Sequence, residues 1–433
     1  MRSLDRLIFF FLCMLVFVLP ASKAGVSIFS VLTILTFLIK KGAQAVVYLR
    51  SSPRPAWRFD PRAGRLLIAL AAVVIINLLA VVWSELPDQS LKAFLSKVLE
   101  HVFLYLAARE VLGSSRRLKT LVGVLIVSAG ILSVDALFQF FSGTDIFKDL
   151  PLVEGRVTAS FSHANGLGAY LVIALSVLFS YGLFLWEKTA VRLRLFRLLA
   201  LLLTGGLGAT VLVMTYSRGA WIGFLAAALL LVLIRRRYAG ILFALMVCFF
   251  LVGLPFLQAT RNVSLVTDTV STGKNEAASG SRSLAEWFRQ SGMTGTGRVG
   301  FWQDAVRIIK DHPLTGTGLN TYTNTIQRYS DAWKAYPHNS YLQMSAEIGL
   351  PGVLVFFLFV IFHMMYAARV VRGGGPDASI IAGIMAGIFG FLVHAFFDTT
   401  LYSVQHPALF WILLGSVAAA LGQKGPGPCK LTK

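Results

Sequence analysis

Charged residues are scarce in this 433-residue chain, at 14% of the sequence, and acidic residues are the scarcest, with 20 Asp and Glu against 40 Lys and Arg. Because about a quarter of the residues in a soluble globular domain are charged, this composition excludes an ordinary soluble protein. Hydrophobic residues make up 56% and form repeated apolar runs, each long enough to cross a bilayer as a helix. The sequence therefore predicts an all-α, polytopic membrane protein.

Cysteine is also rare, and its placement excludes several kinds of site. Cys13, Cys248 and Cys429 lie in or beside apolar runs or in the tail, with no metal-ligand spacing, and we assign them no disulfide. His, Asp and Glu show no metal-site spacing either, and no Walker-type or dinucleotide glycine pattern occurs. The sequence predicts no metal, no cofactor and no nucleotide use on the outer face. The lack of an internal repeat disfavours inverted-repeat transporters.

The apolar runs predict about twelve membrane-spanning helices. They are residues 6–20, 24–40, 64–83, 91–108, 118–140, 164–186, 196–214, 218–234, 239–257, 352–369, 379–397 and 405–421. We interpret the first run as a spanning helix rather than a cleaved leader, because a second apolar run follows it directly. The chain thus divides into residues 1–257 with nine spans, one large loop at 258–351, and residues 352–433 with three spans and a tail.

The basic residues predict the orientation of these spans. With a cytoplasmic N-terminus, 25 of the 40 Lys and Arg fall in cytoplasmic segments, six in short loops on the other side and nine in the large loop. Cytoplasmic loops carry an excess of Lys and Arg, whereas long loops cross largely regardless of charge. Both termini are therefore expected in the cytoplasm and the large loop on the other side of the membrane. Basic clusters placed this way are orientation signals rather than a nucleic-acid surface.

The large loop contains three predicted pieces. Its first part, residues 267–283, is rich in Ser, Thr, Gly and Ala and is expected to be mobile. Residues 299–310 predict an amphipathic helix in the membrane interface, with Asp304 and Arg307 off its apolar face. The residues of that face are Phe301, Ala305 and Ile309, with Trp302 and Val306 beside them. Residues 339–348 predict a short helix that Gly349 ends, after which Pro351 opens the next span.

Three arginines at the predicted outer ends of spans are candidate anion-binding groups. Arg218 lies in a span junction with almost no loop, next to small residues; the alternative is an interfacial anchor whose side chain snorkels. Arg298 follows a Gly-rich stretch and opens the amphipathic helix, where guanidinium and free backbone N–H groups act together on an anion. The alternative is an interfacial arginine on a solvated loop. Arg156, just before His163, is a weaker case of the same kind, with a structural role as the alternative.

His338 is the candidate general base. Pro337 biases the preceding residue away from helix, and Asn339 or Ser340 can cap the helix that follows. A helix N-terminus disfavours imidazolium, so the ring is expected to stay neutral and able to accept a proton. The alternative is an exposed loop histidine with no role. Asp398 is the outer-end carboxylate that can orient a His or an Arg, or cap a helix, and His163, His394 and His406 are expected near the same cavity.

These residues carry a resemblance to a known family. The run His338-Asn339, followed after nine residues by Gly349-Leu350-Pro351-Gly352, resembles the H-N-x9-G-x-x-G signature of O-antigen ligases, which those enzymes carry at the end of a large periplasmic loop. The stretches 297–302 and 312–318 look like the upstream half of the same block. Ser217-Arg218-Gly219 is similar to the family's other arginine motif.

The resemblance implies a GT-C-like enzyme that transfers O-antigen polysaccharide from undecaprenyl pyrophosphate to lipid A–core oligosaccharide. It implies that His338 deprotonates the acceptor hydroxyl, with inversion at the donor, while Arg218 and Arg298 hold the pyrophosphate. Arg156, His163, Asn339 and Asp398 are expected to contact the pyrophosphate or glycan. The donor is already activated, so neither ATP nor a metal is expected, and the partners are the two lipid-linked glycans and membrane lipids.

Three other functions stay open. An O-antigen polymerase has a related fold and joins repeat units on the same carrier. A protein O-oligosaccharyltransferase is another relative, although such chains usually carry additional soluble sequence. A transporter or flippase predicts polar residues through the middle of the spans, whereas here they gather at the outer ends, with Asp135 and Glu100 as the main exceptions.

Overall fold

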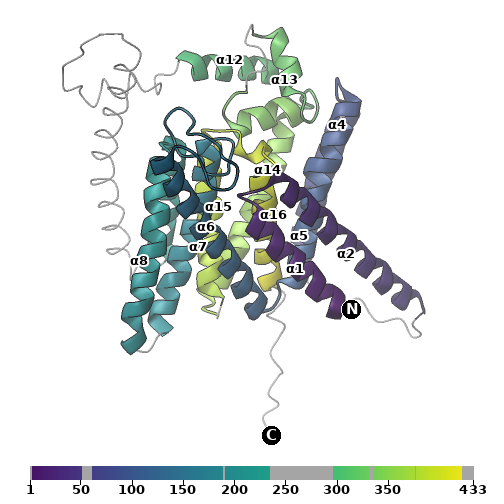
Figure 1. Ribbon diagram of the computed structural model, residues 1–433. Coiled ribbons are helices and arrows are strands. Elements are labelled where there is room, and N and C mark those ends of the chain that lie inside the picture. The colour runs from purple at the N-terminus through teal and green to yellow at the C-terminus, as the bar shows by residue number, and fades with distance from the viewer. Residues whose placement is uncertain are drawn as a thin grey trace, which may run out of the picture.

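Helices dominate the computed structural model, which describes residues 2–50, 61–188, 191–234, 296–330, 336–375 and 377–421 (Figure 1). Within these ranges no β-strand forms, and extended pairing is limited to the isolated bridges Thr144–Pro151 and Val153–Arg156. The start of α1 and the end of α16 lie away from the end of the bundle that carries α12, which we call the α12 end (Figure 1).

The helices coincide with the predicted spans, except that span 239–257 and the stretch 267–283 lie outside the described residues. The elements are α1 (Arg2–Val18), α2 (Lys23–Arg50), α3 (Pro61–Val82), α4 (Pro87–Ala93), the π-helix η1 (Phe94–Leu99), α5 (Glu100–Val111), α6 (Ser115–Ser142), α7 (Ala164–Lys188), α8 (Val191–Met214), α9 (Arg218–Ile234), α12 (Thr296–Asp311), α13 (Tyr322–Thr325), the 3-10 turn η3 (Ile326–Arg328), α14 (Ser340–Arg372), α15 (Ala378–Ala395), the 3-10 turn η4 (Thr400–Tyr402) and α16 (Gln405–Leu421).

Six of the described helices are long and apolar enough to cross a membrane. They are residues Lys23–Arg50, Gly64–Val82, Ser115–Ser142, Ala164–Gly182, Ser340–Arg372 and Ala378–Ala395, and α9, α16 and part of α8 are shorter apolar helices. Large apolar side chains also face outward, such as Ile39 on α2 and Leu203 on α8, as lipid-facing residues do. The chain is a helical multi-pass membrane protein. The number of twelve spans and the side on which each loop lies stay predictions.

Close helix packing brings α9 alongside α15 at the α12 end. A Cβ on Gly223 would lie only 2.5 Å from the carbonyl oxygen of Gly390, so the two backbones approach as only small residues allow. One turn earlier, a Cβ on Gly219 would lie 2.8 Å from Cβ of Phe397. The first turn of α9, which begins with Arg218, therefore lies against the chain that leaves the C-terminal end of α15.

The predicted helix at 339–348 is confirmed, together with its break at Gly349. That residue has φ 72° and ψ 171° inside α14, so the two halves of the helix meet at a kink. The preceding segment, residues 312–318, binds the backbone there: Leu350 N–H donates to Pro313 O at 2.9 Å, and Gly318 N–H donates to Glu347 O at 2.9 Å. The hydrogen bonds that the kink removes from the helix are thus replaced from the loop.

Replacing Gly349 with alanine is expected to destabilise the protein by about 1–3 kcal/mol, because an L side chain is strained at positive φ. Its Cβ would also lie 2.2 Å from the carbonyl oxygen of Leu314. Thermal unfolding in detergent measures the effect. Gly123→Ala is the matched control, since that glycine lies within α6 and its Cβ would meet nothing within 4 Å. Equal unfolding temperatures for the two variants would contradict a structural role for Gly349.

Two features differ from the sequence-based expectation. The predicted span 91–108 contains the π-helix η1, a local widening that the hydrophobic pattern does not encode. In α12 the buried side chains are Ala305, Ile308 and also Asp304, which was expected off the apolar face. Asp304 is tolerated because Arg307 Nη1 donates to its carboxylate at 3.0 Å. Val306, expected beside the apolar face, is exposed instead.

Candidate active site at the α12 end of the bundle

His338 immediately precedes α14, and its position is fixed by the cap of that helix. Asn339 is the N-cap residue, and its Oδ1 accepts the backbone N–H groups of Tyr341 at 2.9 Å and Leu342 at 3.1 Å. The predicted cap is therefore confirmed. The Asn339 side chain is buried and its oxygen is occupied by the cap, so this residue holds His338 in place from behind.

The imidazole of His338 has one protected nitrogen and one open edge. Nδ1 is buried and lies 3.5 Å from Oδ1 of Asp398, a contact longer than an ideal hydrogen bond. The His338 side chain as a whole is 43% exposed, against 15% for Asp398. Since Nδ1 is covered, the exposed edge is the one that carries Nε2. The backbone of His338 has φ 45°, in the left-handed region that non-glycine residues seldom adopt and that is frequent at functional sites.

Asp398 is held from several directions in the turn between α15 and α16. Thr399 N–H donates to its Oδ1 at 2.7 Å, and Ser340 Oγ donates to its backbone oxygen at 2.8 Å. Burial raises the pKa of Asp398, but the His338 ring 3.5 Å away, the neighbouring His394 ring and the N–H of Thr399 together lower that pKa by more. The net pKa lies well below the ordinary value of an aspartate, so the carboxylate beside Nδ1 is ionised at neutral pH.

Helix α12 covers the same turn. Trp302 Nε1 donates to Pro337 O at 2.8 Å, and the Trp302 ring packs edge-on against Phe396 with centroids 5.6 Å apart. The Phe301 ring lies 6.5 Å from that of His338. Arg298 is exposed and lies one helical turn before Phe301 and Trp302 on α12. Its guanidinium interacts electrostatically with His394, which is buried beneath the loop between α15 and α16. The predicted helix start therefore brings Arg298 to the neighbourhood of His338.

Arg218 approaches from the other side. It is half-buried as the first residue of α9, and the following Gly219 lies against Phe397 and His394. The turn before it contains Tyr216 at φ 49°. Arg218 is therefore presented by a tight, strained turn next to the segment that carries Asp398.

Arg156 is joined to Asp398 through one amide. Its Nε donates to Thr215 O at 2.7 Å and its Nη2 to Asn165 Oδ1 at 2.8 Å, and the Asn165 side chain in turn hydrogen-bonds Asp398. Gln139 fixes the loop that carries Arg156 by accepting the N–H of Thr158 at 2.8 Å. Arg156 thus ties this loop to the α8–α9 turn and to the site.

The remaining predicted histidines fall in different environments. His163 is exposed just before α7, near Arg156. His394 is buried under the turn, with Nδ1 3.5 Å from Thr400 Oγ1. His406 is buried as well, stacks on Phe161 and hydrogen-bonds Gly166 O at 2.8 Å. His394 and His406 therefore support the turn from inside rather than face an open cavity.

Asn165, Ser340 and Trp302 position the site, a role that the sequence did not predict for any of them, although Trp302 was expected in the amphipathic helix. Asn165 belongs to the same short segment as His163, and a capping serine at the start of α14 was foreseen only as a helix signal. Their partners are distant in sequence, so only the fold reveals them. Among the described residues, no group of three His, Cys, Asp or Glu side chains is arranged to hold a metal ion.

The structure is thus a multi-pass helical membrane protein with a His–Asp pair near two arginines at one end of its bundle. Residues 201–357 match the sequence model of a family described as O-antigen ligase, and this match supports an O-antigen ligase family assignment. The matched stretch includes Arg218, Arg298 and His338, whereas Arg156 and Asp398 lie outside it. No curated protein matches the chain. The family indicates a glycan-transferring enzyme of the O-antigen ligase or polymerase type.

Proposed function

We propose that this chain ligates O-antigen polysaccharide, carried on undecaprenyl pyrophosphate, to lipid A–core oligosaccharide at the periplasmic face of the bacterial inner membrane. The observation that carries the proposal is the pairing of His338 Nδ1 with Asp398 at 3.5 Å, with the other edge of the ring open. In the proposed orientation both termini lie in the cytoplasm, and the α12 end faces the periplasm, where both lipid-linked glycans are presented.

In the proposed reaction His338 is the general base. Nε2 takes the proton of the acceptor hydroxyl as its oxygen bonds to the anomeric carbon of the donor, and the bond from that carbon to the pyrophosphate oxygen breaks. Attack on the face opposite the leaving group inverts the anomeric configuration. Asp398 accepts from Nδ1–H, which keeps Nε2 free to accept and stabilises the imidazolium that forms.

The leaving group is an anion, and the arginines supply the matching charge. Arg218 and Arg298 flank the turn that bears Asp398, so both are placed to bind pyrophosphate oxygens as negative charge develops. Arg156 and Asn165 brace that arrangement, His163 lies at the exposed rim, and Asn339 holds the base in place. Undecaprenyl pyrophosphate is already an activated donor, so the reaction needs neither ATP nor a metal.

Arg218→Lys and Arg298→Lys are each expected to lower the transfer rate by about 10- to 100-fold, because an ammonium keeps the charge but loses the bidentate geometry of guanidinium. Initial rates at saturating acceptor and varied donor measure this. Arg307→Lys is the matched control, since Arg307 is on the same helix α12 as Arg298 but pairs with Asp304. Near-normal rates for both site variants would refute the pyrophosphate role.

The proposal is tested by reconstitution. Purified protein in lipid vesicles receives lipid-linked O-antigen and lipid A–core in EDTA, without ATP, and the products are separated by gel. Conjugate of O-antigen with lipid A–core is the expected product. If only longer lipid-linked chains form, the polymerase alternative is correct, and if neither product forms while the donor changes leaflet, the chain is a transporter.

A further inference from the structure

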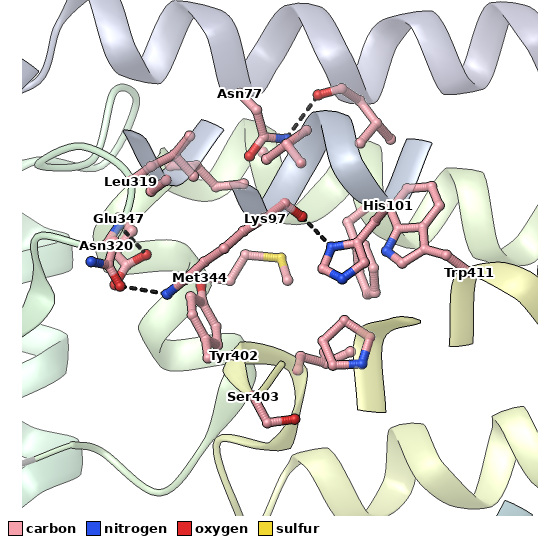
Figure 2. Close-up of a pocket in the computed structure, with 18 residues that line it drawn as sticks. Asn77, Lys97, His101, Leu319, Asn320, Met344, Glu347, Tyr402, Ser403 and Trp411 are labelled. Atoms are coloured by element: carbon pink, nitrogen blue, oxygen red, sulfur yellow. Dashed lines mark hydrogen bonds between the residues drawn. The ribbon is translucent and has the colours of Figure 1, made fainter. Parts of the chain in front are cut away.

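A cavity of about 110 Å³ lies among α3, η1, α5, α14 and the start of α16, apart from His338 (Figure 2). His338 is not among its lining residues, which are Val73, Asn77, Ala93, Lys97, Val98, His101, Leu319, Asn320, Met344, Glu347, Ile348, Gly352, Phe356, Leu401, Tyr402, Ser403, Pro407 and Trp411. The proposed reaction leaves its polar groups unused.

The polar wall consists of groups that are costly to keep inside a helical bundle. Lys97 Nζ donates to Asn320 Oδ1 at 2.6 Å, and Asn320 N–H donates to Glu347 Oε2 at 2.8 Å. Glu347 is completely buried, and Gln343 donates to its other oxygen at 3.0 Å. Lys97 lies in η1 and His101 follows it in α5, so the π-helix, a feature frequent at functional sites, shapes the wall on which both project.

The wall of the cavity offers a ligand hydrogen-bond acceptors. Asn77 Nδ2 donates to Val73 O at 2.8 Å, so the amide oxygen Oδ1 remains as an acceptor. His101 Nδ1 contacts the carbonyl oxygen of Lys97, which can only accept, so Nδ1 carries the proton and Nε2 of the neutral ring is an acceptor (Figure 2). The wall therefore presents two side-chain acceptors, Asn77 Oδ1 and His101 Nε2, and one amine donor, Lys97.

Apolar and aromatic surface completes the cavity. Trp411 from α16 and Tyr402 from η4 contribute rings, and Met344 and Phe356 of α14 contribute apolar surface (Figure 2). A hydroxyl-rich ring with apolar C–H faces fits such a wall, because its hydroxyls donate to the acceptors and its faces pack on the aromatic rings. A phosphate fits poorly, because Asn77 Oδ1 and His101 Nε2 have no proton to donate to it, and an ammonium headgroup would lie beside the amine of Lys97.

We propose that this cavity binds a sugar residue of a membrane glycolipid, with Asn77 and His101 accepting its hydroxyl groups and Lys97 donating. The inference rests on the proposed function, in which both substrates are glycolipids. One turn connects the two sites: Leu401 N–H contacts Ser340 Oγ at 3.4 Å beside Asp398, while Leu401, Tyr402 and Ser403 form a wall of the cavity. A glycolipid held there is anchored next to the base without contacting it.

The test measures binding without turnover. Native mass spectrometry of the purified full-length protein, titrated separately with lipid A–core, lipid-linked O-antigen and phosphatidylethanolamine, gives an apparent Kd for each. Asn77→Leu and His101→Phe, alone and combined, remove acceptors at nearly constant volume. Each single variant loses one hydrogen bond and is expected to bind at least one glycolipid with an apparent Kd about 2- to 10-fold higher. The double variant is expected to raise that Kd by about 10-fold or more. Which glycolipid weakens identifies the substrate that supplies the sugar.

Two controls make the result decisive. His312→Phe is matched in chemistry but lies outside the cavity, and it should bind both glycolipids as the wild type does. His101→Gln restores a side-chain acceptor and should recover most of the affinity lost in His101→Phe. Unchanged glycolipid binding in every folded cavity variant overturns the proposal, as does an equal weakening of phosphatidylethanolamine. If binding behaves as expected but no transfer occurs in the reconstituted assay, the proposed function fails and the sugar site stands.

Discussion

Replacing His338 with asparagine is expected to lower the rate of glycan transfer by about 10²–10⁴-fold, because the acceptor hydroxyl loses its base. Asparagine is the informative substitution, since His338 has φ 45° and asparagine tolerates that conformation better than alanine does. The asparagine amide can also donate a hydrogen bond to the buried carboxylate of Asp398, so that this group does not lose its neighbour. Initial rates in the reconstituted assay, with both glycolipids saturating, measure the change.

The unfolding temperature of His338→Asn should stay close to that of the wild type, because the ring is 43% exposed and the cap of α14 is made by Asn339. His312→Asn is the control, since His312 lies in the same loop region but contacts Glu85 at 3.7 Å, away from the site. If His338→Asn turns over as fast as that control, His338 is not the base.

Asp398→Asn is expected to lower the rate by about 10²-fold or more while substrate KM values stay within a few-fold. The amide cannot stabilise the imidazolium and favours the wrong tautomer, the effect seen when a catalytic histidine loses its carboxylate. The carboxylate is ionised throughout the neutral range because its pKa is held below the ordinary value. The loss should therefore appear at every neutral pH at which the enzyme works.

A stability effect of the same substitution must be separated from a rate effect. The carboxylate of Asp398, with its lowered pKa, contributes stability above its unfolded pKa and loses it only as pH falls through the folded value. Asp377→Asn is the matched control, because this buried aspartate at the other end of α15 accepts from Ser115 Oγ at 2.5 Å. Equal rate losses in the two variants would mean that Asp398 is merely structural.

Much of the architecture is readable from the sequence because lipid leaves few options. Apolar runs must become helices in a bilayer, since every backbone group has to be paired internally. The cap at Asn339 and the break at Gly349 are likewise local, so neighbouring residues suffice to predict them. The π-helix η1 was not predictable, because the apolar periodicity of residues 91–108 does not distinguish a π-turn from an α-helix.

The candidate site is readable only in part. His338, Arg218 and Arg298 stand out by residue type and by position at the ends of predicted helices. Their approach depends on contacts such as Gly219 against Phe397 and Trp302 with Pro337, which join residues far apart in the chain. Asn165, Asn77 and His101 could not be assigned a role from the sequence for the same reason. The role of a single polar residue in an apolar helix depends on neighbours that are distant in the sequence.

The stereochemistry of the product tests whether His338 acts as the base in a direct displacement. If His338 activates the acceptor hydroxyl for direct displacement of pyrophosphate, the new glycosidic bond must have the anomeric configuration opposite to that of the donor. Nuclear magnetic resonance of the anomeric proton in the conjugate and in the lipid-linked donor measures both configurations. Inversion is expected, and retention of the donor configuration would contradict direct displacement by a hydroxyl that His338 activates.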